Sequence, residues 1–263
     1  MDKLPAQPNQ SLIDGMSVLQ ALSSSGEVSC SQIAALLGLE ITRVNRLLKT
    51  LAWLGFAHRL PSRTYSPGPG MHVLSAQSMF GSGLIKKAMG PLKKLHKLKL
   101  ICAMGMLWRD QVCYLYHRGP GMKAEEALGR IGLYPAIHSS IGMALLAEKA
   151  EDEIRILFKN KTPERFSDID KLLSELKKIK SRGYGEVLSK ARSIAVTIGN
   201  PAYAGIALSG NIGDKKIEQI CTVLKQVKNE IEKKDNILQG VFMINMNTRN
   251  NEKKLTTKNT KLT

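Results

Sequence analysis

The sequence lacks any apolar run of about 18 residues, which is the length an α-helix needs to cross a bilayer, so we expect no membrane partner. Its first ten residues are polar and contain two prolines. They lack the apolar core of a secretory signal peptide, and a cytoplasmic location is therefore expected. With 263 residues, the chain has the length of one large domain or two small ones.

Motifs for catalysis and for metal or cofactor binding are also missing. The four cysteines form no C-x-x-C pair, and their spacing fits neither a zinc site nor a disulfide framework, so reduced thiols are expected. The sequence contains no H-x-x-H, no H-E-x-x-H, no G-x-S-x-G and no phosphate-binding loop of the Walker type. We therefore expect no catalytic residues, no metal, no cofactor and no enzymatic activity.

Acidic residues are scarce beside basic ones: 22 Asp and Glu against 39 Lys and Arg give a net charge of +17. This balance is typical of proteins that bind a polyanion, usually nucleic acid, although lysines also keep proteins soluble. The charge is uneven, because residues 84–100 contain six lysines and no acid. Residues 236–263 form a basic polar tail without apolar periodicity, and we predict that it is disordered.

The N-terminal segment begins with two predicted helices. The first covers residues 11–24, opened by Ser11 and Asp14 in the spacing of a capping box. Its predicted apolar face consists of Leu12, Met16, Leu19 and Leu22. The second follows the capping box formed by Ser29 and Gln32, and it ends at Gly38.

A third helix is predicted for residues 41–54, after a short turn that contains Gly38. Its apolar residues follow the i, i+3, i+4, i+7 pattern of a buried stripe: Val44, Leu47, Leu48 and Leu51. Four polar residues lie opposite that stripe, and Arg43 flanks it; the four are Thr42, Asn45, Arg46 and Lys49. Arg pairs with guanine edges and Asn with adenine, so this face suits a helix that reads the major groove. A solvated helix face is the alternative.

The context favours DNA binding. Two short helices joined by a glycine-containing turn form a helix-turn-helix pattern, and its second helix carries the basic face. Residues 56–60 and 64–65 read as two strands around the turn 61–63. They predict a β-hairpin wing with Arg63 at its tip, where it can reach a phosphate or the minor groove.

Four stretches of residues 11–80 carry a recognisable pattern: S-L-I-D-G-M-S-V-L-Q-A-L, S-Q-I-A-A-L-L-G-L, R-V-N-R-L-L-K-T-L-A-W-L-G-F and R-T-Y-S-P-G-P-G-M. They resemble the winged helix-turn-helix of the IclR (isocitrate lyase regulator) family of bacterial transcription factors. The resemblance implies a sequence-specific transcriptional regulator, with repression as the expected mode, that binds an operator in double-stranded DNA. The expected DNA-binding residues are Ser31, Gln32, Thr42, Arg43, Asn45, Arg46, Lys49 and Arg63.

The rest of the chain mixes helices with antiparallel strands, so the predicted class is α+β. Helices are predicted at 82–100, from 139 onward, at 168–180 and at 214–233, and strands at 100–107, 111–117, 194–198 and 203–208. Pro91 predicts a kink near Gly90 in the first of these helices. The expected organisation is an N-terminal arm (1–10), a winged helix-turn-helix (11–68), a linker helix (69–82), an effector-binding and oligomerisation domain (83–235) and the tail (236–263).

The second segment contains I-H-S-S-I-G-M-A-L-L-A, I-K-S-R-G-Y, S-I-A-V-T-I and A-G-I-A-L-S-G. These stretches resemble the family's effector-binding domain, a GAF/PAS-like α/β domain, and imply a small organic or sugar acid bound at a helix start, where free N–H groups suit a carboxylate. The resemblance gives as effector-binding candidates Ser139, Ser140, Ser193 and Ser209, with Met122 and Leu128 as apolar walls.

The chain departs from the family in this segment. The stretch after R-G-Y is about four residues short, only Glu186 can replace the family's acidic residue, and Ser193 stands where Cys is common. The serines could instead cap a helix or lie on a strand surface. Two other functions stay open: an enzyme whose basic surface attracts anionic substrates, and a non-specific nucleic-acid-binding protein. The family implies a homodimer or homotetramer.

Overall fold

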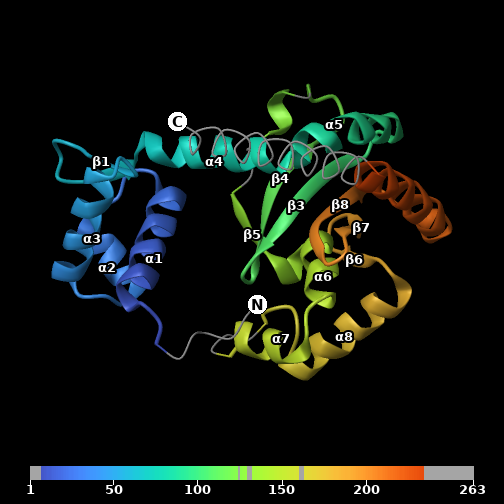
Figure 1. Ribbon diagram of the computed structural model, residues 1–263. Coiled ribbons are helices and arrows are strands. Elements are labelled where there is room, and N and C mark those ends of the chain that lie inside the picture. The colour runs from blue at the N-terminus through green and yellow to red at the C-terminus, as the bar shows by residue number, and fades with distance from the viewer. Residues whose placement is uncertain (1–6, 124, 129–131, 160–162, 234–263) are drawn as a thin grey trace, which may run out of the picture. The chain divides into compact units, whose positions relative to one another are not determined.

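The computed structural model describes residues 7–123, 125–128, 132–159 and 163–233. The chain divides into two compact units, with the boundary between Leu84 and Ile85 (Figure 1). The predicted tail and the first six residues of the predicted arm lie outside the described residues. Within the described residues, no helix combines the length and the apolar character that a membrane span requires.

The N-terminal unit contains a three-helix bundle, a two-stranded hairpin and a further helix. Its elements are α1 (Gln10–Ser25), α2 (Cys30–Leu37), α3 (Ile41–Trp53), β1 (Ala57–Arg59), β2 (Tyr65–Pro67) and α4 (Pro69–Ser82). The bundle encloses its own apolar core, whose fully buried members are Val18, Leu22, Ile33, Val44 and Leu48. A winged helix-turn-helix with these helices, as the sequence predicts, is confirmed.

The ends of α2 follow the predicted local chemistry. The Ser29 hydroxyl accepts the backbone N–H of Gln32, and the Gln32 side chain accepts the N–H of Ser29 at 2.8 Å, so the predicted capping box is present. Gly38 adopts a left-handed conformation with φ of 64°, which ends the helix. The turn to α3 is therefore encoded by residues that are adjacent in the sequence.

Helix α1 differs from its prediction. It begins at Gln10, with Asn9 rather than Ser11 as its cap, because the Asn9 side chain accepts the N–H of Leu12. The predicted apolar face is wrong in part: Leu12 and Met16 are 63% and 49% exposed. The buried residues of α1 are instead Asp14, Val18, Ala21 and Leu22.

The hairpin forms the predicted wing. Strands β1 and β2 pair in antiparallel register, with Arg59 opposite Tyr65. The backbone N–H of Tyr65 donates to Val28 at 2.8 Å, which ties the wing to the segment between α1 and α2. Arg63 lies in the turn with φ of 62°.

The C-terminal unit is built on a six-stranded antiparallel sheet with strand order β5-β4-β3-β8-β7-β6 (Figure 1). Its strands are β3 (Ile101–Trp108), β4 (Gln111–Arg118), β5 (Leu133–Pro135), β6 (Gly185–Leu188), β7 (Arg192–Gly199) and β8 (Ala202–Gly210). Its α-helices are α5 (Leu84–Leu95), α6 (Ser140–Ala147), α7 (Glu151–Leu157), α8 (Ile169–Arg182) and residues 217–233. Short 3₁₀ turns occur at η1 (His96–Leu98), η2 (Glu125–Ala127), η3 (Ala136–His138) and η4 (Asp214–Lys216).

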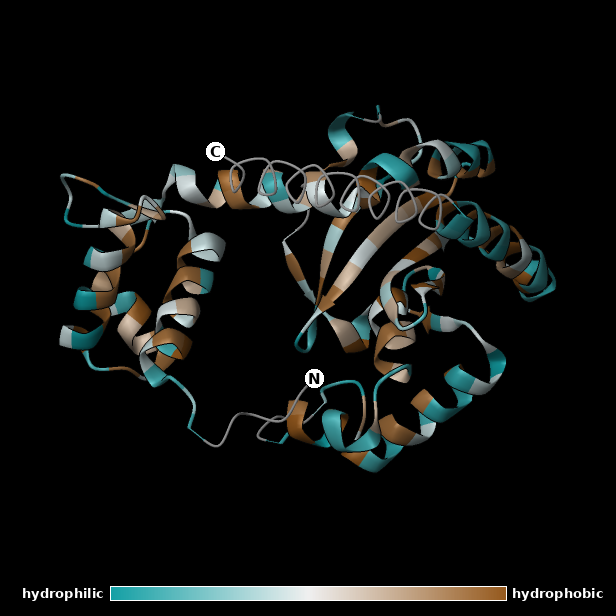
Figure 2. Cartoon of the chain, viewed as in Figure 1, coloured by the Kyte–Doolittle hydropathy of each residue, from teal (hydrophilic) through white to brown (hydrophobic). Residues whose placement is uncertain are grey.

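Helix α6 is the centre of this unit, and all eight of its residues are buried. It packs on the sheet in one apolar core with Ala103, Ala195 and Ala207, and α8 contributes Leu172 and Leu176. Figure 2 shows hydrophobic residues along α6 and alternating hydrophilic and hydrophobic residues along α8. The helix therefore lies between the sheet and an outer helical layer.

The start of this unit differs from its prediction. Helix α4 ends at Ser82, and Gly83 adopts a left-handed conformation with φ of 60° before α5 begins. Helix α5 then continues through Pro91 without the predicted break. The fixed φ of proline is close to helical, so the helix loses one hydrogen bond and goes on.

Candidate DNA-binding surface and ligand cavity

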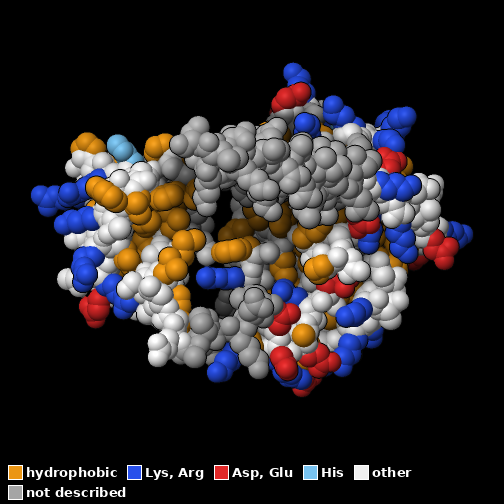
Figure 3. Space-filling view, in the orientation of Figure 1, with side chains coloured by type: hydrophobic (Ala, Val, Ile, Leu, Met, Phe, Trp, Pro, Cys, Tyr) orange, Lys and Arg blue, Asp and Glu red, His pale blue; other side chains and the backbone are white. Residues whose placement is uncertain are grey.

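The outward face of α3 is polar and accessible. Thr42, Arg46 and Lys49 are exposed, and Asn45 is half-buried, whereas Val44 and Leu48 are fully buried. The helix is thus fixed to its domain by one stripe and presents four hydrogen-bonding side chains on the other. Figure 3 shows Lys and Arg side chains along one edge of the N-terminal unit.

Two predicted DNA-binding residues at the start of α2 already have local partners. The side-chain oxygen of Gln32 caps α2, as described above, and the Ser31 hydroxyl lies 3.0 Å from that of Ser29. Both residues are exposed. Their role at DNA stays a prediction.

Arg43 is held differently from the other basic residues of α3. Its Nη2 atom lies 2.6 Å from Oδ2 of Asp14 on α1, and the Asp14 side chain is only 7% exposed. Periodicity could not reveal this pair, because Asp14 occupies a position that the sequence predicted to be outside the apolar face.

The wing is braced by an acidic residue that the sequence analysis did not single out. The Glu27 carboxylate accepts hydrogen bonds from the hydroxyls of Thr64 at 2.6 Å and Ser62 at 3.0 Å. These bonds, first the one from Thr64, hold the pKa of Glu27 below its ordinary value. The turn that carries Arg63 is thereby attached to the segment between α1 and α2.

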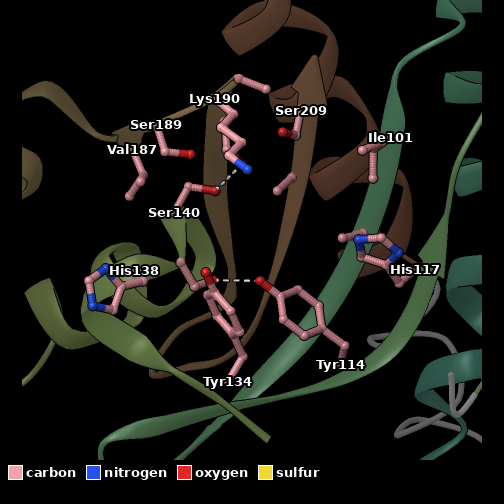
Figure 4. Close-up of a pocket in the computed structure, with 15 residues that line it drawn as sticks. Ile101, Tyr114, His117, Tyr134, His138, Ser140, Val187, Ser189, Lys190 and Ser209 are labelled. Atoms are coloured by element: carbon pink, nitrogen blue, oxygen red, sulfur yellow. Dashed lines mark hydrogen bonds between the residues drawn. The ribbon is translucent and has the colours of Figure 1, made fainter. Parts of the chain in front are cut away.

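A cavity of about 320 Å³ opens in the C-terminal unit at the start of α6 (Figure 4). Ser139 caps the helix by accepting the N–H of Gly142, and its hydroxyl also lies 2.9 Å from the hydroxyl of Tyr114. The Ser140 hydroxyl lies 2.7 Å from that of Ser193 on β7. The positive end of the α6 dipole therefore borders the cavity.

Four of the predicted effector-binding residues line this cavity, namely Ser139, Ser140, Ser193 and Ser209. The structure also brings together Tyr114, His117, Tyr134, His138 and Lys190, which the sequence analysis did not connect with a ligand. Strand pairing brings Tyr114 and Tyr134 there, since β4 lies beside β5 in the sheet. Lys190 lies in the turn between β6 and β7 and extends toward Ser140 and Ser209 (Figure 4).

The other three predicted effector residues do not line the cavity. The sulfur of Met122 accepts the N–H of Gly119 at 3.1 Å within its own loop. Leu128 forms an isolated bridge with Tyr116 and is 42% exposed. Glu186 forms ion pairs with Arg192 at 2.9 Å and with Arg182 at 3.7 Å, so its carboxylate has a structural partner.

The cavity lining contains Lys190, two histidines and five serines but no Asp or Glu. Burial raises the pKa of Tyr114, so its phenol stays protonated and can donate a hydrogen bond near neutral pH. Among the described residues, no three His, Cys, Asp or Glu side chains cluster as metal ligands would. The chemistry of this lining is that of a receptor for a small anion with hydroxyl or carboxylate oxygens.

A winged helix-turn-helix with an exposed basic reading helix, followed by an α/β unit with a polar cavity, defines the class of ligand-responsive DNA-binding regulators. Family models agree with this class: the IclR helix-turn-helix domain matches residues 11–61, and the bacterial transcriptional regulator IclR C-terminal domain matches residues 77–229. The chain belongs to the IclR family of helix-turn-helix DNA-binding transcriptional regulators, which bind DNA operators and small-molecule effectors.

Named relatives span most of the chain. The HTH-type transcriptional regulator KdgR of Escherichia coli is 27% identical over 194 residues, which cover 71% of this chain and 73% of KdgR. An IclR family regulator from Brucella abortus superimposes with a TM-score of 0.71 at 23% identity, covering 87% of this chain and 94% of that one. An IclR homologue from Microbacterium hydrocarbonoxydans, complexed with 4-hydroxybenzoate, has a TM-score of 0.62 at 17% identity and covers 85% and 98%.

Proposed function

We propose that this protein is a cytoplasmic repressor that binds a specific operator and whose affinity for the operator is set by a small acid. The observation that carries the DNA-binding part is the exposed polar face of α3. In this proposal α3 enters the major groove, Asn45 and Arg46 contact base edges, and Thr42 and Lys49 contact phosphates or bases. Arg63 reaches the backbone or the minor groove from the wing.

The proposed effector is a small organic or sugar acid bound in the cavity at the start of α6. Support comes from the absence of acidic residues in the lining and from the cation of Lys190. A carboxylate there would meet the positive end of α6 and the serine hydroxyls. The Microbacterium homologue, whose bound 4-hydroxybenzoate is a small carboxylate, is consistent with this class.

The proposed assembly is a homodimer that reads a near-palindrome, with a homotetramer as the alternative. Helix α4 has no buried residue, and several apolar side chains of α1 and α4 are exposed, namely Leu12, Met16, Val73, Leu74, Met79 and Phe80. A second copy of this surface would cover them. We further propose that the chain is not an enzyme, which fits the regulatory role of its relatives.

The test is competitive selection from a random duplex library at about physiological salt, where non-specific binding is weak. The full chain is compared with Arg46→Ala, which loses about 1–3 kcal/mol of specific binding if Arg46 reads a base. A near-palindromic motif that is enriched by the full chain and lost in the variant is the expected result.

The selection is repeated with a panel of small carboxylic and sugar acids. Repression by an effector-released operator predicts that one acid of the panel abolishes enrichment. Enrichment of a motif that no acid changes would contradict the effector proposal alone. Binding that is independent of sequence would contradict the operator proposal and support non-specific nucleic-acid binding.

A further inference from the structure

The carboxylate of Asp14 is buried in the interior of the winged domain. The residue is 5% exposed on α1, among apolar neighbours that include Val18 and Leu22. Burying a charge is costly unless it is paired and hydrogen-bonded. Asp14 has both kinds of partner, because Gln10 Nε2 donates to Oδ1 at 2.8 Å and Arg43 Nη2 lies 2.6 Å from Oδ2.

Arg43 supplies the cation of this pair from the reading helix itself. In a helix of 3.6 residues per turn, Arg43 lies about 90° around from the centre of the face that holds Thr42, Arg46 and Lys49. Its side chain is 43% exposed, yet its guanidinium is bound to α1. The pair therefore joins α1 to α3 at the edge of the DNA-binding surface.

A phosphate of DNA would have to compete with Asp14 for this guanidinium. Moving Arg43 to the phosphate would leave Asp14 as a buried charge without its cation, which is strongly unfavourable. A contact between a solvent-exposed cation and a phosphate gains little in exchange, since water and salt screen it. The balance keeps Arg43 on Asp14.

We infer that Asp14 is a positioning residue that fixes the rotation of α3 and withholds Arg43 from DNA. This inference rests on the proposed function, and it replaces the expectation that Arg43 is a DNA contact. Of the basic residues on α3, Arg46 and Lys49 then remain as contacts. Asp14 thereby lowers the sequence-independent part of the affinity by about one phosphate contact.

The test measures the salt dependence of binding to a non-operator duplex and to the selected motif, for the full chain, Asp14→Asn, Arg43→Gln and the double variant. Each phosphate contact contributes about 0.9 to the slope of log K against log salt. We expect Asp14→Asn to steepen the slope by about 0.9 and to bind non-operator DNA more tightly. Arg43→Gln should keep the slope of the full chain, and the double variant, whose two amides can hydrogen-bond, should return to it.

A slope that falls by about 0.9 in Arg43→Gln would overturn the inference, because Arg43 would then contact phosphate in the natural protein. An unchanged slope in folded Asp14→Asn would also overturn it. Motif selection by the full chain is scored separately, so failure of the operator proposal is distinguishable from failure of the Asp14 inference.

A second measurement needs no variant. Phenylglyoxal modification followed by mass spectrometry reports the accessibility of each arginine in the full chain. We expect Arg46 to react faster than Arg43 without DNA, and DNA to protect Arg46 while leaving the rate at Arg43 unchanged. Equal protection of the two arginines by DNA would contradict the inference even if the Asp14 variants fail to fold.

Discussion

At the scale of single residues, two acids shape the DNA-binding unit from opposite sides of water. Asp14 is buried and acts on the reading helix, whereas Glu27 is exposed and acts on the wing through the hydroxyls of Ser62 and Thr64. Both are acids in a domain that must approach a polyanion. Their positions make sense only as supports for the basic residues nearby.

The Glu27 support predicts a pH dependence of the wing. The pKa of Glu27 is lowered in the folded chain, so its stabilising effect is full above the ordinary carboxyl pKa and is lost as the pH falls through the lowered value. Amide exchange at Leu60, whose N–H donates to Thr64 at 2.9 Å, reports on the wing. We expect Glu27→Gln to exchange faster at neutral pH, with the difference vanishing near about pH 3.

The control for this prediction is Glu40→Gln, because Glu40 precedes α3 and makes no side-chain capping bond. It should leave exchange at Leu60 unchanged. An equal acceleration in both variants, or a difference between Glu27→Gln and the natural chain that persists at low pH, would show that the carboxylate does not brace the wing.

At the scale of elements, α6 depends on the absence of side chains around it. A Cβ on Gly142 would overlap the carbonyl oxygen of Ala136, and one on Gly185 would overlap that of Ser140. A Cβ on Gly205 would lie 2.9 Å from a methyl group of Ile141. These glycines bring the helix close to η3 and to the sheet, and this close packing positions Ser139 and Ser140 at the cavity.

Gly142→Ala should therefore destabilise the C-terminal unit by about 1–3 kcal/mol through overpacking. Thermal or denaturant unfolding measures the change, and weaker acid binding should accompany it because Ser139 moves with the helix. Gly213→Ala is the matched control, since a Cβ there meets nothing within 4 Å. Equal stabilities of the two variants would contradict the packing argument.

The sequence predicts elements well where their signals are local. The capping box of α2, the stripe of α3 and the hairpin of β3 and β4 each depend on neighbouring residues, and all are found. Helix α1 is less predictable, because Leu12 and Met16 satisfy the apolar period while Asp14 is buried through a partner 29 residues further along the chain.

The ligand cavity divides in the same way. Its serines were predicted by resemblance to a family, and the cap at Ser139 has a local signal. Tyr114, Tyr134 and Lys190 reach the cavity through strand pairing and a turn that are distant in sequence. Glu186 was expected there, but its side chain pairs with Arg192 across neighbouring strands instead. No periodicity encodes such long-range pairings.

At the scale of the whole molecule, the charge lies mostly outside the domain that reads DNA. Residues 11–68 hold five basic and three acidic residues, whereas residues 84–100 hold six lysines and no acid. On α5 and η1, Lys86, Lys93 and Lys97 lie opposite the buried face. None of the three forms an ion pair with another described residue. Figure 3 shows basic side chains in this part of the molecule.

These lysines should serve general attraction to DNA and not its reading. Replacing Lys86, Lys93 and Lys97 together by Gln should weaken binding to non-operator duplex and reduce its salt slope by about 0.9 for each phosphate that these lysines neutralise. The ratio of operator to non-operator affinity should not fall. Filter binding across a series of salt concentrations measures both quantities.

The matched control removes the same charge from α8 by replacing Lys171, Lys178 and Lys180 with Gln, where Glu175 and Asp170 lie on the same helix. We expect a smaller change in slope. Equal changes in the two triple variants would mean that only the total charge matters, and a loss of selectivity in the α5 variant would place those lysines at the operator.

Helix α4 has a consequence for how the protein responds to its own abundance. An isolated helix of about 12–15 residues is marginally stable in water, and α4 has 14 residues, none of them buried. Association that covers its apolar side chains would therefore also order it. Synthesis of the regulator and folding of its linker become linked by mass action, so that a cell containing few copies would hold chains whose two units are joined by a loose tether, and a cell containing many would hold chains joined by a strut.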